Sequence, residues 1–166
     1  MKILKEDYNT VNDFFCKALR EKNKKSVCTR CDIEPIALIR KADFICNIIK
    51  SLEAESIICR ILFWEKNEKI ESFLQKHIPG NEYVVYKHYN NRMTPGICFV
   101  HASKDMIPFL RVLLANHFNF ELAKAPSLSV RVQICINAKY LGFLLDVYDD
   151  RGFFMHILKN KYTILA

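Results

Sequence analysis

Apolar residues recur at intervals of three or four along four segments of the chain, which is the spacing of an amphipathic helix. The first two segments are residues 6–25 and 34–54. Their predicted inward-facing residues are Val11, Phe14, Phe15, Ala18 and Leu19 in the first and Ile39, Ala42, Ile45, Ile49 and Leu52 in the second. Pro35 stands where the first turn of the second helix tolerates a proline. The connecting residues 26–33 are expected to form a loop or a short extended piece.

The other two helices are predicted in the middle of the chain. The third lies within residues 67–80, with Asn67 as its expected cap and Pro79-Gly80 as its stop. Its predicted inward-facing residues are Ile70, Phe73 and Leu74. Residues 103–118 form the fourth, with Asp105 as its expected cap and Pro108 in its first turn.

Runs of β-branched and aromatic residues between these helices predict strands. Residues 56–64 form a buried strand, and residues 82–89 and 96–102 form two more, joined by a turn. In residues 127–137 apolar and polar side chains alternate, which predicts a half-buried strand with one wet face. The closely linked runs 140–148 and 153–158 complete an antiparallel meander.

Together these elements predict a single α+β domain over residues 1–166. The sheet is expected to be mainly antiparallel with a C-terminal meander, and two N-terminal helices and two further helices are expected to pack on it. Residues 1–54 form the helical N-terminal part, and residues 55–166 form the mixed sheet and helix part. A chain of 166 residues with 51% hydrophobic residues can bury a substantial core.

The excess of basic residues bears on which class of partner the protein could bind. The chain carries 25 basic and 18 acidic residues, a formal net charge of +7. This balance suits an anionic partner, either nucleic acid or an acidic protein, without identifying which. Asp146, Asp149 and Asp150 form an acidic cluster in an otherwise basic half of the sequence.

The cysteines and the known motifs bear on location and chemistry. The seven cysteines are an odd number and several stand in apolar runs, so reduced thiols and a cytoplasmic location are expected. The start lacks a signal peptide pattern, and no segment has the length and apolar character of a membrane span. Cys28 and Cys31 have the CxxC spacing of a zinc or redox site, but no second ligand pair follows. No metal, cofactor or enzymatic activity is therefore expected, with a Cys/His enzyme as a minor alternative.

The sequence DDRG at residues 149–152 predicts a tight turn between the last two strands. It fits a type I turn followed by a G1 bulge. Asp149 would accept backbone N–H bonds at the first corner, and Gly152 would supply a positive φ. Both are therefore interpreted as structural turn residues.

Four neighbouring residues are not required by this turn. Asp146 and Tyr148 are two positions apart, so they share one face of the incoming strand. Asp150 and Arg151 complete the tip of the hairpin. These four residues are the candidate partner-binding site.

Nucleic-acid binding is the alternative that the basic charge suggests. A sheet that binds single-stranded nucleic acid places aromatic residues beside basic ones on exposed strands. Arg131 lies on the wet face of its predicted strand, but its neighbours along that face are Ser129 and Gln133. Nucleic-acid binding through a basic face is therefore the less favoured hypothesis.

Residues 116–152, NHFNFELAKAPSLSVRVQICINAKYLGFLLDVYDDRG, resemble an uncharacterised bacterial domain family. The family has a strand that begins with PSLS and a hairpin that carries YDDRG. Residues 126–129 and 148–152 carry the resemblance, which extends over residues 56–160. The family has no established activity, so it implies no catalytic residue.

Domains of this style are similar to immunity proteins of contact-dependent growth-inhibition and polymorphic toxin systems. The resemblance implies a cytoplasmic protein that binds and neutralises a cognate toxin domain, expected to be a nuclease, by blocking its active site. Asp146, Asp149 and Asp150 would take the place of phosphates in a basic nuclease groove.

Overall fold

The computed structural model describes residues 2–3, 8–21, 28–78, 83–87, 94–102, 106–121, 127–149 and 151–158. Its helices and strands, in chain order, are β1 (Lys2–Ile3), α1 (Tyr8–Glu21), β2 (Cys28–Asp32), α2 (Leu38–Ser51), β3 (Ala54–Phe63), α3 (Asn67–His77), β4 (Tyr83–Lys87), β5 (Gly96–Ala102), α4 (Ile107–Glu121), β6 (Val130–Ala138), β7 (Gly142–Val147) and β8 (Gly152–Leu158).

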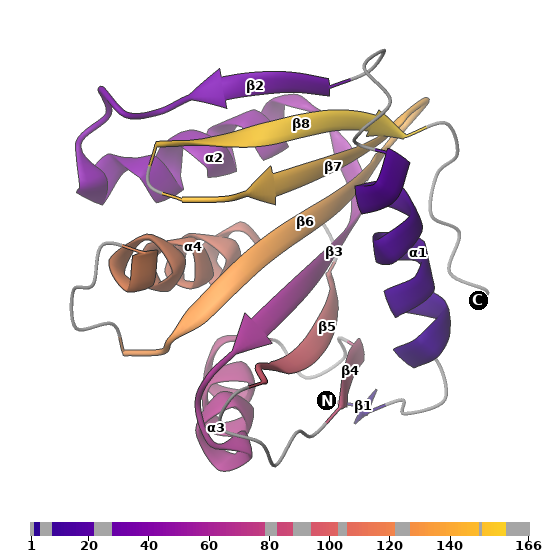
Figure 1. Cartoon of the computed structure of the whole chain (residues 1–166), viewed down its shortest axis with the longest axis vertical. Helices are drawn as coiled ribbons and strands as arrows, with labels where there is room; N and C mark the ends of the chain where they lie inside the picture. Colours follow the sequence, from indigo (N-terminus) through magenta and orange to yellow (C-terminus); the bar gives the residue numbers. More distant parts are fainter. Residues whose placement is uncertain are drawn as a thin grey trace.

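The eight strands of the described residues form one sheet in the order β1-β4-β5-β3-β6-β7-β8-β2 (Figure 1). All the pairings among these strands are antiparallel except that of β1 with β4. The strands β6, β7 and β8 form the predicted C-terminal meander. The α+β class, the mainly antiparallel sheet and the four predicted helices packed on it are therefore confirmed.

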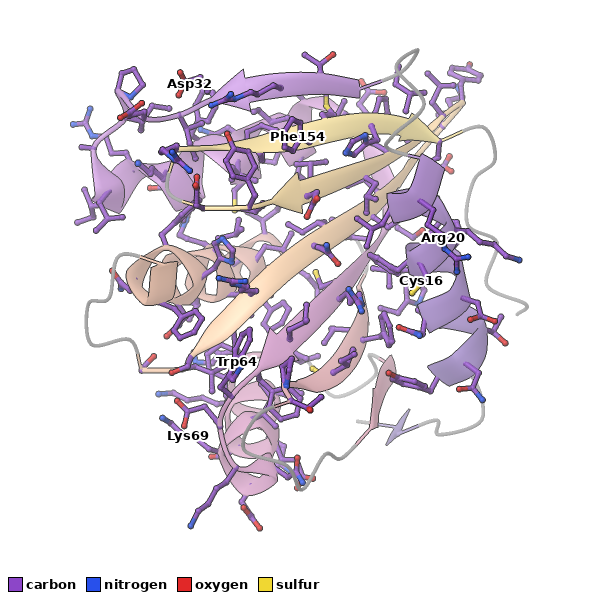
Figure 2. The ribbon with its side chains drawn as sticks, viewed as in Figure 1. Cys16, Arg20, Asp32, Trp64, Lys69 and Phe154 are labelled. Carbon is purple, nitrogen blue, oxygen red and sulfur yellow. The ribbon has the colours of Figure 1, made fainter. Side chains whose placement is uncertain are left out.

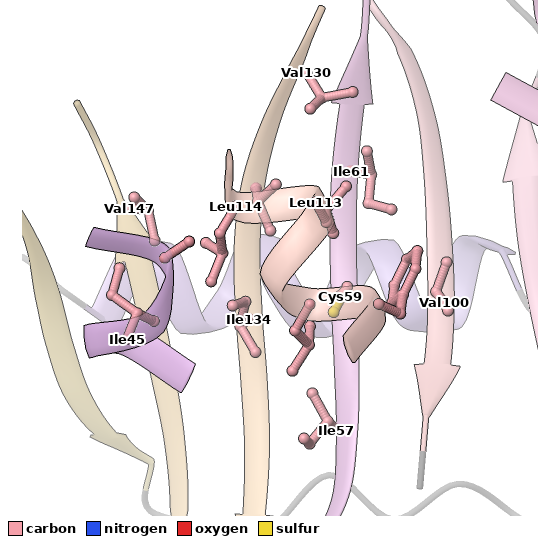
Figure 3. Close-up of a cluster of buried hydrophobic side chains, with 14 of the residues drawn as sticks. Ile45, Ile57, Cys59, Ile61, Val100, Leu113, Leu114, Val130, Ile134 and Val147 are labelled. Carbon is pink, nitrogen blue, oxygen red and sulfur yellow. The ribbon is translucent and has the colours of Figure 1, made fainter. Parts of the chain in front are cut away.

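The described helices cover the two faces of the sheet unequally. Alternate residues of β3 point to opposite faces, and Ile57, Cys59 and Ile61 lie in the large core with α2, α3 and α4 (Figure 3). Ile58 points the other way and packs with α1, where Phe15 is fully buried. Of the four described helices, three thus cover one face and α1 packs on the other (Figure 1).

The start of α2 differs from the prediction. The helix begins at Leu38, so Pro35 lies in the preceding turn rather than in the first helical turn. Ile39 continues the helical spacing of apolar residues, yet it is 86% exposed, whereas Leu38 in the same turn packs against the large core. Ile45, less than two turns further along the helix, is fully buried.

Other local predictions met mixed outcomes. Residues 28–32 form a full strand, β2, which pairs with β8 at one edge of the sheet. The residue at the N-cap of α3 is Lys66 rather than Asn67, which is already helical. Pro108 lies in the first turn of α4 as predicted, whereas the expected cap Asp105 is outside the described residues.

The predicted wet face of β6 is only partly wet. Arg131 is exposed and Gln133 is half-buried, but Cys135 and Asn137 on the same face are buried. Cys135 belongs to the small core beneath α1. Helix α1 therefore divides this face of the sheet into a covered part and an open part.

Candidate functional site

The open part of the sheet begins one row of residues away from α1. The covered row contains Ile58, Cys135 and Leu144, which are paired across β3, β6 and β7. Two residues further along each strand, the next row on the same face runs through Arg60, Gln133, Asp146, Phe154 and Arg30, on β3, β6, β7, β8 and β2.

We call this region the open half-face. It consists of Arg30, Arg60, Trp64, Arg131, Gln133, Asp146, Tyr148 and Phe154. Arg30 and Arg131 are exposed and Trp64 is 39% exposed, so the region is accessible to a partner. Figure 2 shows Trp64 and Phe154 on the sheet away from α1, the helix that carries Cys16 and Arg20.

A row of hydrogen bonds crosses the middle of the open half-face. The Arg60 guanidinium donates to Gln133 Oε1 over 2.8 Å, and Gln133 Nε2 donates to Asp146 Oδ1 over 2.9 Å. The Gln133 amide thus uses both its acceptor and its donor side, which fixes its orientation. Asp146 is only 9% exposed. Its carboxylate therefore hydrogen-bonds within the sheet and is not an exposed acidic group that a partner could bind.

One aromatic cluster lies beside this row near the end of β7. The rings of Tyr148 and Phe154 are 5.0 Å apart between centroids. The Arg30 guanidinium lies 5.9 Å from the centroid of the Tyr148 ring, within cation–π range. We call Arg30, Tyr148 and Phe154 the Tyr148 cluster.

A second aromatic cluster lies at the end of β3. Trp64 stacks on Phe120 of α4, with ring centroids 5.1 Å apart. The Arg131 guanidinium lies 5.7 Å from the Trp64 ring centroid. The Trp64 backbone N–H donates to the Ser129 carbonyl, which extends the pairing of β3 with β6 to this point. We call Trp64, Phe120 and Arg131 the Trp64 cluster.

The hairpin tip is held together by an ion pair. Asp149 Oδ2 accepts hydrogen bonds from Arg151 Nε at 2.8 Å and Nη2 at 2.6 Å, and Asp149 Oδ1 accepts one from the Arg151 backbone N–H at 2.8 Å. Burial alone would raise the pKa of Asp149, but these bonds and the Arg151 charge bring that pKa below its ordinary value. Asp149 is therefore bonded internally, and Arg151 is its partner.

Gly152 is required for a different reason from the one predicted. Its φ is not positive, so the expected G1 bulge with a left-handed glycine is wrong. A Cβ atom on Gly152 would lie 2.5 Å from the Cys31 carbonyl oxygen and 2.6 Å from Tyr148 Oη. Glycine is needed because β2 and the Tyr148 ring both approach the backbone closely at this position.

A buried histidine supports the strand that carries Arg131. His117 of α4 is fully buried, and its Nδ1 accepts the Val132 backbone N–H over 3.2 Å. This bond lies just beyond the last pair of β6 with β7, Gln133 with Asp146. Burial of the ring, together with the nearby Arg131 charge, lowers the pKa of His117 to about 3. The imidazole is therefore neutral at pH 7 and acts as a hydrogen-bond acceptor for β6.

The candidate site predicted from sequence is thus divided by the structure. Asp146 and Tyr148 lie on the open half-face, as their spacing predicted, but Asp146 is hydrogen-bonded and buried. Arg151 is exposed at the tip and paired with Asp149. Asp150 lies outside the described residues.

Sequence reasoning missed Arg30, Arg60, Trp64 and Phe154. Arg60 and Phe154 stand on strands that were predicted correctly, and alternation along each strand assigns them to a face. The order of the strands brings them together, and no pattern along the chain encodes that order.

The CxxC pair has no geometry that favours a metal or redox site. Cys28 and Cys31 belong to the extended strand β2, not to a loop that opens a helix. Cys31 is half-buried and packs against the large core. Among the residues that the structure describes, no group of three or more His, Cys, Asp or Glu side chains is arranged to hold a metal ion.

Comparison of the chain with protein-family models, curated proteins and solved structures found no match. Within the described parts of the chain, no helix is both long enough and apolar enough to cross a membrane.

Proposed function

We propose that this protein binds nucleic acid through the open half-face. The observation that carries the proposal is that each aromatic cluster there holds an arginine against a ring, Arg131 with Trp64 and Arg30 with Tyr148. Aromatic rings stack on bases, and guanidinium groups bind phosphates and also stack on bases. The combination suits a polymer that is both anionic and aromatic.

The charges of the same region support an anionic partner. The open half-face has three arginines, Arg30, Arg60 and Arg131, and one acid, Asp146. The neighbouring acids Asp149 and Glu65 are paired with Arg151 and with Lys69, the latter at 2.8 Å. Arg30 and Arg131 are exposed beside them. The net charge of +7 adds a favourable long-range field for a polyanion.

The sequence alone disfavours nucleic-acid binding, because Arg131 has no aromatic neighbour along its own strand. Its neighbours on the adjacent strand change this preference. Along β6 the face-mates of Arg131 are the polar residues Ser129 and Gln133. Its aromatic neighbour, Trp64, comes from the end of the adjacent strand β3. The arginine and the aromatic ring therefore come from two different strands, and the sequence of either strand alone does not contain the pair.

Fluorescence anisotropy with labelled oligonucleotides of mixed sequence, about 20 nucleotides long, tests the proposal. Binding is expected to weaken steeply between about 50 and 200 mM salt, because arginine contacts to phosphates release counterions. Arg131→Glu is expected to weaken binding, whereas Arg40→Glu, at an exposed position on α2, is not. Absence of binding to RNA and DNA at low salt would contradict the proposal.

A toxin-neutralising immunity protein is the second candidate function. The resemblance of residues 126–129 and 148–152 to an immunity-like family favours it. Trp, Tyr and Arg, which the open half-face contains, are also the residues that dominate binding energy at protein interfaces. The acidic cluster is less suited to binding a basic toxin groove than the sequence suggested, because Asp146 and Asp149 are already bonded internally.

Co-expression with the product of the adjacent upstream gene tests the second candidate. An immunity protein is expected to restore growth that this product inhibits and to form a complex of submicromolar affinity with it. Loss of growth rescue, or affinity weaker than micromolar, removes this candidate.

A further inference from the structure

We infer that the nucleic acid bound by the open half-face is a single strand that lies across β3, β6 and β7, with one base on each aromatic cluster. This inference rests on the proposed function and specifies its ligand. It follows from the separation of the two clusters, from the position of Arg131 on the strand between Trp64 and Tyr148, and from the hydrogen bonds that fix the sheet beneath.

The separation of the clusters is set by the strand register. Trp64 follows β3 and Tyr148 follows β7, and β6 lies between these strands. The Trp64 N–H pairs with Ser129, which is two residues before Arg131 on β6. Continued by two residues beyond its last pair, Gln133 with Asp146, the register of β6 and β7 places Tyr148 opposite Arg131. Two strand spacings and two residues of rise then separate the backbone positions of Trp64 and Tyr148, about 12 Å along the sheet.

This separation excludes neighbouring bases of a duplex. Stacked bases in a double helix follow one another at about 3.4 Å along each strand, and their faces are covered by their neighbours. Two aromatic residues whose backbone positions are about 12 Å apart can each accept a base only if the bases are unstacked and spread apart. Single-stranded RNA or DNA can adopt that conformation, and its bases can then stack on aromatic side chains.

Arg131 has the position of a backbone contact between the two bases. It stands on β6, which lies between β3, followed by Trp64, and β7, followed by Tyr148, and its side chain is exposed. Its guanidinium remains within cation–π distance of Trp64. A phosphate between two spread bases would therefore meet a positive charge that is already oriented beside the first base.

The surface beneath the nucleic-acid strand is preorganised. The bonds from Arg60 to Gln133 and from Gln133 to Asp146 tie β3, β6 and β7 together on this face. His117 holds the β6 backbone at Val132, next to Arg131. A binding surface fixed in advance loses less conformational entropy when the ligand binds.

The test compares three probes under the same salt conditions. The first is a labelled single strand of about 20 thymidines, the second a GC-rich DNA duplex with the same number of nucleotides, and the third poly-L-glutamate as a competitor. We expect the single strand to bind at least about tenfold more tightly than the duplex, and poly-L-glutamate to compete weakly at equal charge.

The variants Trp64→Ala and Tyr148→Ala test the two clusters separately. Each is expected to weaken single-strand affinity by about 5- to 150-fold, the cost of losing one base stack. Thermal melting followed by circular dichroism establishes that each variant is folded. If Tyr148→Ala is unfolded, the affinity of Trp64→Ala decides the outcome.

The matched control for these variants is Tyr140→Ala. Tyr140 is an exposed ring that also has a cation beside it, since the Lys139 ammonium lies 5.2 Å from the ring centroid. It follows the C-terminal end of β6, whereas Arg131 stands near the N-terminal end of that strand. Tyr140→Ala should therefore leave single-strand affinity unchanged.

The possible outcomes distinguish single-strand binding from nucleic-acid binding in general. Equal affinity for duplex and single strand, or unchanged affinity in either folded aromatic variant, overturns the inference of one base on each cluster and leaves nucleic-acid binding intact. Competition by poly-L-glutamate as strong as that by the unlabelled oligonucleotide also overturns it, because the surface would then accept an acidic polypeptide. Absence of binding to any oligonucleotide removes the proposed function as well.

Discussion

Two groups from different parts of the chain meet at Gly152 and leave no room for a side chain. One is the Cys31 carbonyl oxygen of the edge strand β2, and the other is the Tyr148 hydroxyl at the end of β7. Both approach the backbone from outside the turn itself. The smallest residue therefore allows β2 to join the sheet while the Tyr148 ring remains in its cluster.

Replacement of Gly152 tests whether glycine is required at this position because of steric crowding or because of a positive φ. Gly152→Ala is expected to lower the free energy of unfolding by about 1–3 kcal/mol, because the added Cβ meets the Cys31 carbonyl oxygen and Tyr148 Oη. Gly152→Asn should be at least as destabilising, although asparagine tolerates positive φ better than alanine does. Urea unfolding measures both variants. A more stable asparagine variant would show that backbone conformation, not crowding, is the cause.

Asp149 gives the tip a predictable dependence on pH. Its pKa is lowered in the folded protein, so its ionised form stabilises the fold at neutral pH, and this contribution disappears as pH falls below about 4 through the folded pKa. Asp149→Asn is expected to cost about 1 kcal/mol or less at pH 7, because the ion pair is partly exposed to solvent. The difference from the wild type in urea unfolding should shrink at pH 3. A difference that grows with acidity would contradict this assignment.

These two residues also show how far a local pattern can predict a turn. Asp149 and Gly152 were both expected to be structural; Asp149 accepts hydrogen bonds from Arg151, and a Cβ on Gly152 would meet Cys31 and Tyr148. The sequence DDRG is compatible with several turns, however, and the contact that selects glycine comes from β2, far earlier in the chain. A local pattern cannot contain the approach of a distant carbonyl group.

Helix α2 allows the contribution of an exposed isoleucine to stability to be compared with that of a buried one. Both Ile39 and Ile45 were predicted to face the core, but Ile39 is 86% exposed and Ile45 is fully buried. Ile45→Ala is expected to lower the free energy of unfolding by about 2–5 kcal/mol. Ile39→Ala removes the same atoms and should change it by less than about 0.5 kcal/mol. Similar losses for the two variants in urea unfolding would show that Ile39 is packed.

The spacing of apolar residues predicted the helices and most strands, but not which elements pack on or pair with each of them. Cys135 alternates with apolar residues in the sequence as a surface residue would, yet α1 buries it. Residues 28–32 include Thr, Arg and Asp and lack an apolar pattern, and they form an edge strand through backbone pairing with β8. Burial of a polar position and pairing at an edge both depend on neighbours that are remote in sequence.

Across the entire domain, the open half-face depends on the order of strands in the sheet. Its residues extend from Arg30 to Phe154 and come together only because β2 joins the meander at one edge and β3 pairs with β6. The net charge of +7 permits an anionic partner but does not say where it would bind. The position of the surface was not predictable, because strand order depends on long-range packing that is not visible as a local pattern.

The single tryptophan of the chain, Trp64, allows base stacking on the open half-face to be measured directly. Titration of the protein with a single-stranded oligonucleotide, followed by intrinsic fluorescence, reports whether a base stacks on this ring. We expect quenching that saturates, that reverses as salt is raised and that Arg131→Glu weakens, since Arg131 lies beside the ring. Unchanged Trp64 emission under conditions where anisotropy shows the oligonucleotide to be bound would contradict binding at the open half-face, because the oligonucleotide would then lie elsewhere on the protein.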